Sequence, residues 1–143
     1  MADKDNLPVT AAGMVAYKSG SNGLVIALAD ESSEMNWNTA NGASGAAAHN
    51  RTVTGQTWKL PSKAEWELMF SANDTGLNTA ITAAGGTALA LQNSQNDNYY
   101  WSSTEFDSGK AAYLVELFSG GSANWTYGSE SSLNKRVRAC FAF

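Results

Sequence analysis

The sequence has little of what disulfide frameworks, metal centres and nucleic-acid surfaces need. Its 143 residues include one cysteine and one histidine, so an internal disulfide is excluded and a metal site built on His49 is not expected. The 9 Lys and Arg residues form no long basic stripe, and phosphate binding requires clustered cations. We therefore expect no nucleic-acid partner. The longest apolar runs are too short to cross a bilayer, so we expect no direct membrane insertion.

Catalytic motifs are missing as well. No G-x-S-x-G elbow is present to place a serine nucleophile, and the glycine pairs lack the Gly-Lys-Ser ending of a phosphate loop. Because no set of acid, base and nucleophile converges in the sequence, we expect no enzymatic activity, no cofactor and no metal. Residues 1–6 are polar and acidic, so no signal peptide is expected in this chain.

The composition is that of one globular domain. Hydrophobic residues make up 43% of the chain, and its length suffices to bury a core without staples. Two apolar runs, 13–17 and 24–28, flank the turn-forming pair Asn22-Gly23, which predicts a β-hairpin. A polar loop at 30–34 follows, and the small residues of 37–48 predict a short helix interrupted by glycine.

A capping box gives the clearest local prediction. Ser62 and Glu65 have the spacing at which each side chain accepts the other's backbone N–H. Apolar residues at helical spacing follow, so we predict a helix that ends near Ala72. A second helical turn is expected at 78–84, where Gly85-Gly86 stops it.

The last third of the chain predicts strands. The four expected strands are 99–104, 111–118, 122–127 and 136–143, with turns at 107–109 and 120–121. Helices segregated from antiparallel strands predict an α+β fold. We assign 13–143 to a single domain, 1–12 to an N-terminal extension, and Cys140 to a buried structural role in the last strand.

Three sequence blocks together resemble a bacterial and phage protein group. They are Trp58-x-Leu60-Pro61-Ser62-x-x-Glu65-Trp66, Tyr100-Trp101-Ser102-Ser103-Thr104-Glu105, and Arg136-Val137-Arg138 with Phe143 at the end. This group is similar to the bacterial major paralogous domains and to the formylglycine-generating-enzyme-like branch of the C-type lectin fold. The resemblance implies a C-type lectin fold with antiparallel strands and two short helices. Formylglycine-generating enzymes use a pair of cysteines, so the resemblance does not extend to their activity.

Within that group, the chain resembles most the variable proteins of diversity-generating retroelements. The resemblance implies a hypervariable, ligand-binding region at about 99–143, displayed between framework residues. Two departures stand out: Ala139-Cys140-Phe141 replaces a usual Pro-Val-Arg, and Ala111-Ala112 replaces a common Ala-Trp pair. The framework residues that match are Trp101, Ser102, Ser103, Thr104, Glu105, Gly121, Arg136, Val137, Arg138 and Phe143.

The composition of 106–133 is typical of a binding surface, because aromatic residues lie among Ser, Gly, Asn and Thr. In the strand at 111–118, Glu116 is an unfavourable residue to bury. Strand alternation then predicts that Leu114 and Phe118 face outward beside it. The predicted ligand-binding residues are Phe106, Ser108, Tyr113, Leu114, Glu116, Phe118, Ser122, Asn124, Trp125, Tyr127 and Ser129.

Two functions remain as hypotheses. The first is receptor or surface recognition, including adhesion, with an unknown protein or glycan ligand and with display on a virion or bacterial cell surface. An oligomer would raise the avidity of such a protein. The alternative is a structural surface, pilus or tail domain without a specific ligand site. Burial of Leu114, Phe118 and Trp125 would favour this alternative.

Overall fold

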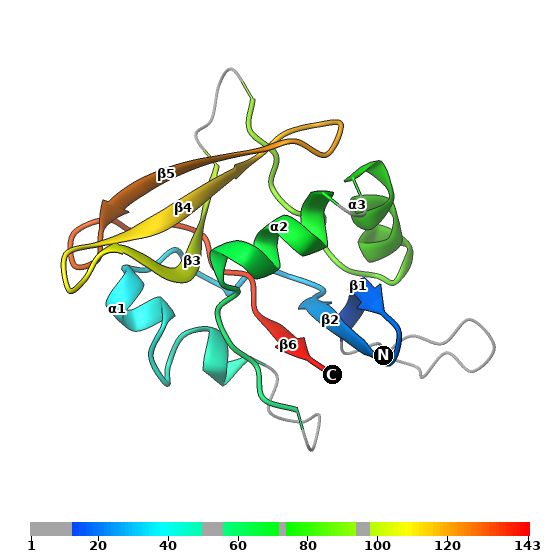
Figure 1. The fold of residues 1–143 in the computed structure, drawn as a ribbon, viewed down its shortest axis with the longest axis horizontal. Coiled ribbons are helices and arrows are strands. Elements are labelled where there is room, and N and C mark those ends of the chain that lie inside the picture. The colour runs from blue at the N-terminus through cyan, green and yellow to red at the C-terminus, as the bar shows by residue number, and fades with distance from the viewer. Residues whose placement is uncertain (1–12, 50–55, 72–73, 94–97) are drawn as a thin grey trace.

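The computed structural model describes residues 13–49, 56–71, 74–93 and 98–143, and the predicted N-terminal extension lies outside these ranges. The prediction of a single α+β domain is confirmed. Two three-stranded antiparallel sheets have the orders β1-β2-β6 and β3-β4-β5, and they are separate in Figure 1. The strands are β1 (Gly13–Ser19), β2 (Asn22–Ala27), β3 (Tyr99–Asp107), β4 (Ala111–Leu117), β5 (Ala123–Ser129) and β6 (Cys140–Ala142). The helices are α1 (Trp37–Ala40), the 3-10 helix η1 (Ala46–Ala48), α2 (Lys63–Ser71) and α3 (Asp74–Ala83).

The predicted hairpin is β1–β2, but its turn lies two residues earlier in the chain than expected. Ser19 pairs with Asn22, so the loop is Gly20-Ser21, and Gly20 supplies the positive φ of 61°. A glycine in the first loop position suits a two-residue hairpin. Gly23 belongs to β2 instead, where a Cβ would collide with the ring of Phe143. The prediction that Asn22-Gly23 forms the turn is therefore wrong.

The capping box is confirmed at the start of α2. The Glu65 N–H donates to Ser62 Oγ at 3.1 Å, and the Ser62 N–H donates to Glu65 Oε1 at 2.9 Å. Burial opposes ionisation of Glu65, but the hydrogen bonds from Lys59 and Ser62, with the charge of Lys59, lower its pKa. The helical turn predicted at 78–84 belongs to α3, which begins earlier, at Asp74. The stretch 37–48 forms two short pieces, α1 and η1.

Replacing Ser62 with alanine should lower the free energy of unfolding by about 1 kcal/mol, because the N–H of Glu65 loses its acceptor. Urea unfolding followed by circular dichroism measures this change. Ser119→Ala, in an exposed turn, is the control and should stay within about 0.5 kcal/mol of the parent. Equal stabilities of the two variants would contradict a contribution from the cap.

Two hydrophobic clusters form the core, and β4 contributes to both. One cluster contains Trp66, Tyr100 and Val115, and the other contains Trp101 and Leu114. Helix α2 contacts both sheets and runs between them in the view of Figure 1. The middle of β4 is therefore covered on both faces, which is unusual for an antiparallel sheet in so small a domain.

The predicted last strand, 136–143, crosses from one sheet to the other. Its first residue forms a parallel bridge with Tyr100 on β3, and the N–H of Ala27 on β2 donates to the carbonyl of Ala139 at 2.8 Å. Only residues 140–142 pair as the strand β6. Cys140 is fully buried there, as predicted, and burial, followed by the charge of Glu65, raises the pKa of its thiol to about 12.

A buried polar network joins this last segment to the rest of the fold. Asp30 accepts hydrogen bonds from Arg138 Nε at 2.7 Å, from the Tyr100 hydroxyl at 2.8 Å and from Arg136 Nη1 at 3.3 Å. Arg138 is fully buried. Burial and the charge of Asp30 raise the pKa of Tyr100 well above its usual range. Asp30 therefore lies in the predicted loop, but its carboxylate is bonded to side chains of the domain, which the sequence did not predict.

Candidate binding surface

Four aromatic side chains gather at one end of the β3-β4-β5 sheet. Tyr113 on β4 lies opposite Tyr127 on β5, and directly paired residues share one face of a sheet. The rings of Phe106 and Tyr127 are stacked, with centroids 4.0 Å apart and an interplanar angle of 1°. Tyr113 meets Phe106 edge-on at 5.5 Å and Trp125 edge-on at 6.2 Å. We call Phe106, Tyr113, Trp125 and Tyr127 the aromatic face.

The aromatic face is open to solvent at its outer end. Phe106 is 49% exposed and Tyr127 is 56% exposed, whereas Tyr113 and Trp125 are half-buried. Trp125 packs partly against the core cluster that contains Trp66. The inner rings therefore anchor the outer pair to the domain, and the stacked pair presents apolar area to the surroundings.

One lysine belongs to this surface although no sequence signal pointed to it. Lys63 is the first residue of α2, and its Nζ lies 4.6 Å from the ring centroid of Tyr113 and 5.4 Å from that of Trp125. Its backbone N–H donates to Thr104 Oγ1 on β3 at 3.0 Å. Lys63 precedes Tyr113 by 50 positions and Trp125 by 62 in the chain, so only the tertiary fold brings the ammonium to the rings.

The prediction that Leu114 faces outward is wrong. Leu114 is only 2% exposed and lies in the core cluster with Trp37 and Trp101. The prediction failed because it used Glu116 to orient the whole strand. Glu116 is half-buried near the end of β4, while Trp37 and Trp101 cover the same face at Leu114. A buried side chain cannot contact a ligand, so Leu114 is not part of the binding surface.

The other predicted residues do not form one patch. Glu116 lies opposite Asn124 on the face of the sheet away from Tyr113. Phe118, half-buried, and Ser122, exposed, belong to the β4–β5 turn, where the Phe118 N–H donates to the Ser122 carbonyl at 2.8 Å. At the aromatic end, Ser108 is exposed in the β3–β4 turn and Ser129 is half-buried at the end of β5.

Three carboxylates lie near the β3–β4 turn. Burial raises the pKa of Glu130, and a hydrogen bond with Glu105 and the charges of Glu105 and Asp107 raise it further. Despite this clustering, no group of three or more His, Cys, Asp or Glu residues in the described part of the chain is placed to hold a metal ion. His49 instead pairs with Glu31 at 2.7 Å.

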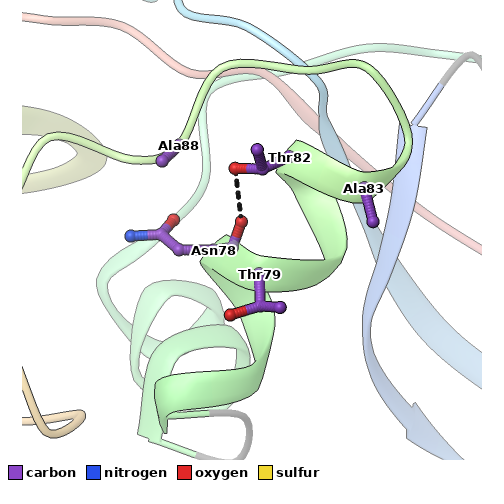
Figure 2. Close-up of a pocket in the computed structure, with 5 residues that line it drawn as sticks. All are labelled: Asn78, Thr79, Thr82, Ala83 and Ala88. Atoms are coloured by element: carbon purple, nitrogen blue, oxygen red, sulfur yellow. Dashed lines mark hydrogen bonds between the residues drawn. The ribbon is translucent and has the colours of Figure 1, made fainter.

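Two depressions lined by described residues lie away from the aromatic face. One, of about 500 Å³, lies along α3 and is lined by Asn78, Thr79, Thr82, Ala83 and Ala88 (Figure 2). The Asn78 side chain there forms two hydrogen bonds with the backbone of Leu89. Its Oδ1 accepts the N–H at 2.7 Å, and its Nδ2 donates to the carbonyl at 3.2 Å. The other, of about 360 Å³, lies between α2 and the end of β6 and includes Leu68 and Phe143.

Comparison of the chain with protein-family models, with curated proteins and with solved structures found no match. None of the helices in the described ranges has the length and apolar character needed to cross a membrane.

Proposed function

We propose that this chain is a non-enzymatic ligand-binding protein that presents the aromatic face on a scaffold of the C-type lectin fold. The observation that carries the proposal is the cluster of contacting rings Phe106, Tyr113, Trp125 and Tyr127, whose outer pair, Phe106 and Tyr127, is stacked and exposed. Large apolar groups that gather at a surface mark interaction sites. Tyrosine and tryptophan also provide wide contact area at a low cost in conformational entropy.

The position of the sequence blocks supports this division between scaffold and binding surface. Trp58, Trp66, Tyr100, Trp101 and Arg138 come from the three blocks that resemble the retroelement-diversified proteins, and all five are buried. Phe106 and Tyr127, the exposed residues of the aromatic face, lie between the second and third blocks. This arrangement suits a variable protein in which framework residues hold the fold and the region at about 99–143 carries specificity.

The proposed ligand is a protein or glycan on a target surface, and the proposed setting is a virion or a bacterial cell surface. A stack of aromatic rings can pack against apolar side chains or against the apolar face of a sugar. Assembly into an oligomer would raise the avidity of such a site without any new contact.

One observation favours the alternative of a structural domain without a ligand site. Burial of Leu114 and half-burial of Phe118 and Trp125 mean that part of the predicted patch packs inside the domain. A surface, pilus or tail domain without a ligand site would show such packing. The exposure of Phe106 and Tyr127 favours the binding function over this alternative.

The proposal predicts that the double variant Phe106→Ser/Tyr127→Ser loses binding but not stability. Surface substitutions usually change the free energy of unfolding by up to about 0.5 kcal/mol, so the melting temperature should fall by no more than about 4 °C. Fluorescently labelled protein is incubated with a panel of bacterial strains and binding is counted by flow cytometry. The parent should bind a subset of strains, and the double variant should bind none of them.

Two controls make this result interpretable. Ser132→Ala, at an exposed turn residue, should bind as the parent does. Leu114→Ala should cost about 2–5 kcal/mol of stability, as expected of a core leucine. Equal binding of the double variant and the parent to the same strains would exclude the aromatic face as the ligand-binding surface. If neither the parent nor any variant binds a strain of the panel, the result would favour the structural alternative.

A further inference from the structure

The Lys63 ammonium lies on the aromatic face, and no carboxylate in the described part of the chain forms an ion pair with it. Lys59 pairs with Glu65 at 2.7 Å and Lys110 pairs with Asp107 at 3.9 Å, whereas no ion pair among the described residues involves Lys63. The Lys63 side chain is half-buried. Its positive charge is therefore partly removed from water and is not neutralised by any described carboxylate.

The fold holds this ammonium in place. The Lys63 backbone is fixed by its bond to Thr104 Oγ1, and the rings of Tyr113 and Trp125 attract the cation through their negative faces. In Figure 1 the N-terminal end of α2 lies beside the β3-β4-β5 sheet. A ligand that pairs with this cation would not have to order a long, mobile side chain, which is a usual cost of a lysine contact.

The carboxylates on either side of Phe106 in the sequence are engaged elsewhere, and Glu65, two residues after Lys63, pairs with Lys59. Glu105 Oε2 accepts the Gly109 N–H at 2.7 Å, and Asp107 faces Lys110 across the β3–β4 turn. These contacts hold the negative charges at the turn. A carboxylate from outside the chain would therefore meet, at the inner edge of the aromatic face, a positive charge that no carboxylate of the described residues pairs with.

We propose that the aromatic face binds an acidic segment of a partner protein, in which an Asp or Glu carboxylate pairs with the Lys63 ammonium. An apolar side chain next to that carboxylate packs on the stacked rings of Phe106 and Tyr127. This inference rests on the proposed ligand-binding function and adds the chemistry of the ligand. The rings come from three strands and neither described depression includes them, which suits an extended protein segment better than a small molecule.

A library of random peptides displayed on phage tests the inference. The library is selected in parallel on the parent, Lys63→Arg, Lys63→Met and Phe106→Ser/Tyr127→Ser. The parent and Lys63→Arg should enrich peptides with Asp or Glu beside an aromatic or aliphatic residue, and Lys63→Met should lose the acidic preference. One enriched peptide, synthesised with Glu and with Gln, should bind the parent about fivefold more tightly in the Glu form and should bind Lys63→Met equally in both forms.

The outcomes separate the two proposals. Enriched peptides without acidic residues that nevertheless fail to bind Phe106→Ser/Tyr127→Ser would overturn the role of Lys63 and leave the binding function standing. Peptides that bind this double variant as well as the parent would overturn both. Absence of any enrichment would also count against both. Raising the salt concentration should weaken the Glu peptide more than the Gln peptide, because the ion pair is partly exposed.

Discussion

Replacing Arg138 with methionine is expected to lower the free energy of unfolding by about 3–5 kcal/mol, because the substitution leaves a carboxylate without its buried partner. Arg138 is fully buried and donates to Asp30 Oδ1 at 2.7 Å. It also donates to the carbonyl oxygens of Ala27 at 3.0 Å and Thr87 at 2.8 Å. Methionine fills a similar volume but satisfies none of these acceptors. Urea unfolding of the parent and the variant measures the difference.

Lys110→Met is the matched control for Arg138→Met. Its side chain is 78% exposed and lies 3.9 Å from Asp107, and such surface pairs contribute between zero and about 1 kcal/mol. A cost below about 1 kcal/mol for Arg138→Met would mean that water or Arg136 replaces the lost donor. In that case the network around Asp30 would not be a major source of stability.

Replacing Trp101 with alanine is expected to cost about 3–5 kcal/mol, because a large buried ring leaves a cavity. Trp101 is fully buried, and its indole Nε1 donates to the carbonyl of Met35 at 2.8 Å. The ring packs in the core cluster that also contains Leu114 and Val137. Thermal unfolding followed by circular dichroism, together with urea titration, measures the loss.

Two further variants define the cause of the Trp101 effect. Trp101→Phe retains an aromatic ring but loses the indole donor, so it should lie between the parent and Trp101→Ala in stability. Tyr127→Ala removes a ring that is 56% exposed and should change stability far less than Trp101→Ala. Similar losses for Trp101→Ala and Tyr127→Ala would contradict the separation of framework from aromatic face.

The elements that the sequence predicted well are those set by neighbouring residues. The capping box needs only Ser62 and Glu65, three positions apart, and its two hydrogen bonds are present. The turns at Gly109 and Gly120-Gly121 likewise follow from local chemistry, and these glycines have φ of 74°, 94° and 88°. Local interactions require particular residues at fixed sequence spacings, so they can be predicted without knowledge of the fold.

The features that the sequence did not predict depend on distant contacts. Asp30 lies in a polar segment, and only the fold brings Arg138 to it. Leu114 was expected outside because its strand carries Glu116, but a tryptophan from α1 and one from β3 cover it. Lys63 precedes the aromatic residues by dozens of positions and reaches them through the packing of α2. No short sequence pattern predicts the positions of these three residues in the fold.

The ring contacts of the aromatic face have a consequence for how this surface can evolve. Phe106 touches Tyr127 and Tyr113, and Tyr113 in turn touches Trp125 and the Lys63 ammonium. Residues in direct contact have non-additive effects, so the result of one replacement depends on which neighbour is present. New specificities at this surface would arise through epistatic combinations of substitutions, and a path through single changes would pass through intermediates with a partly broken stack.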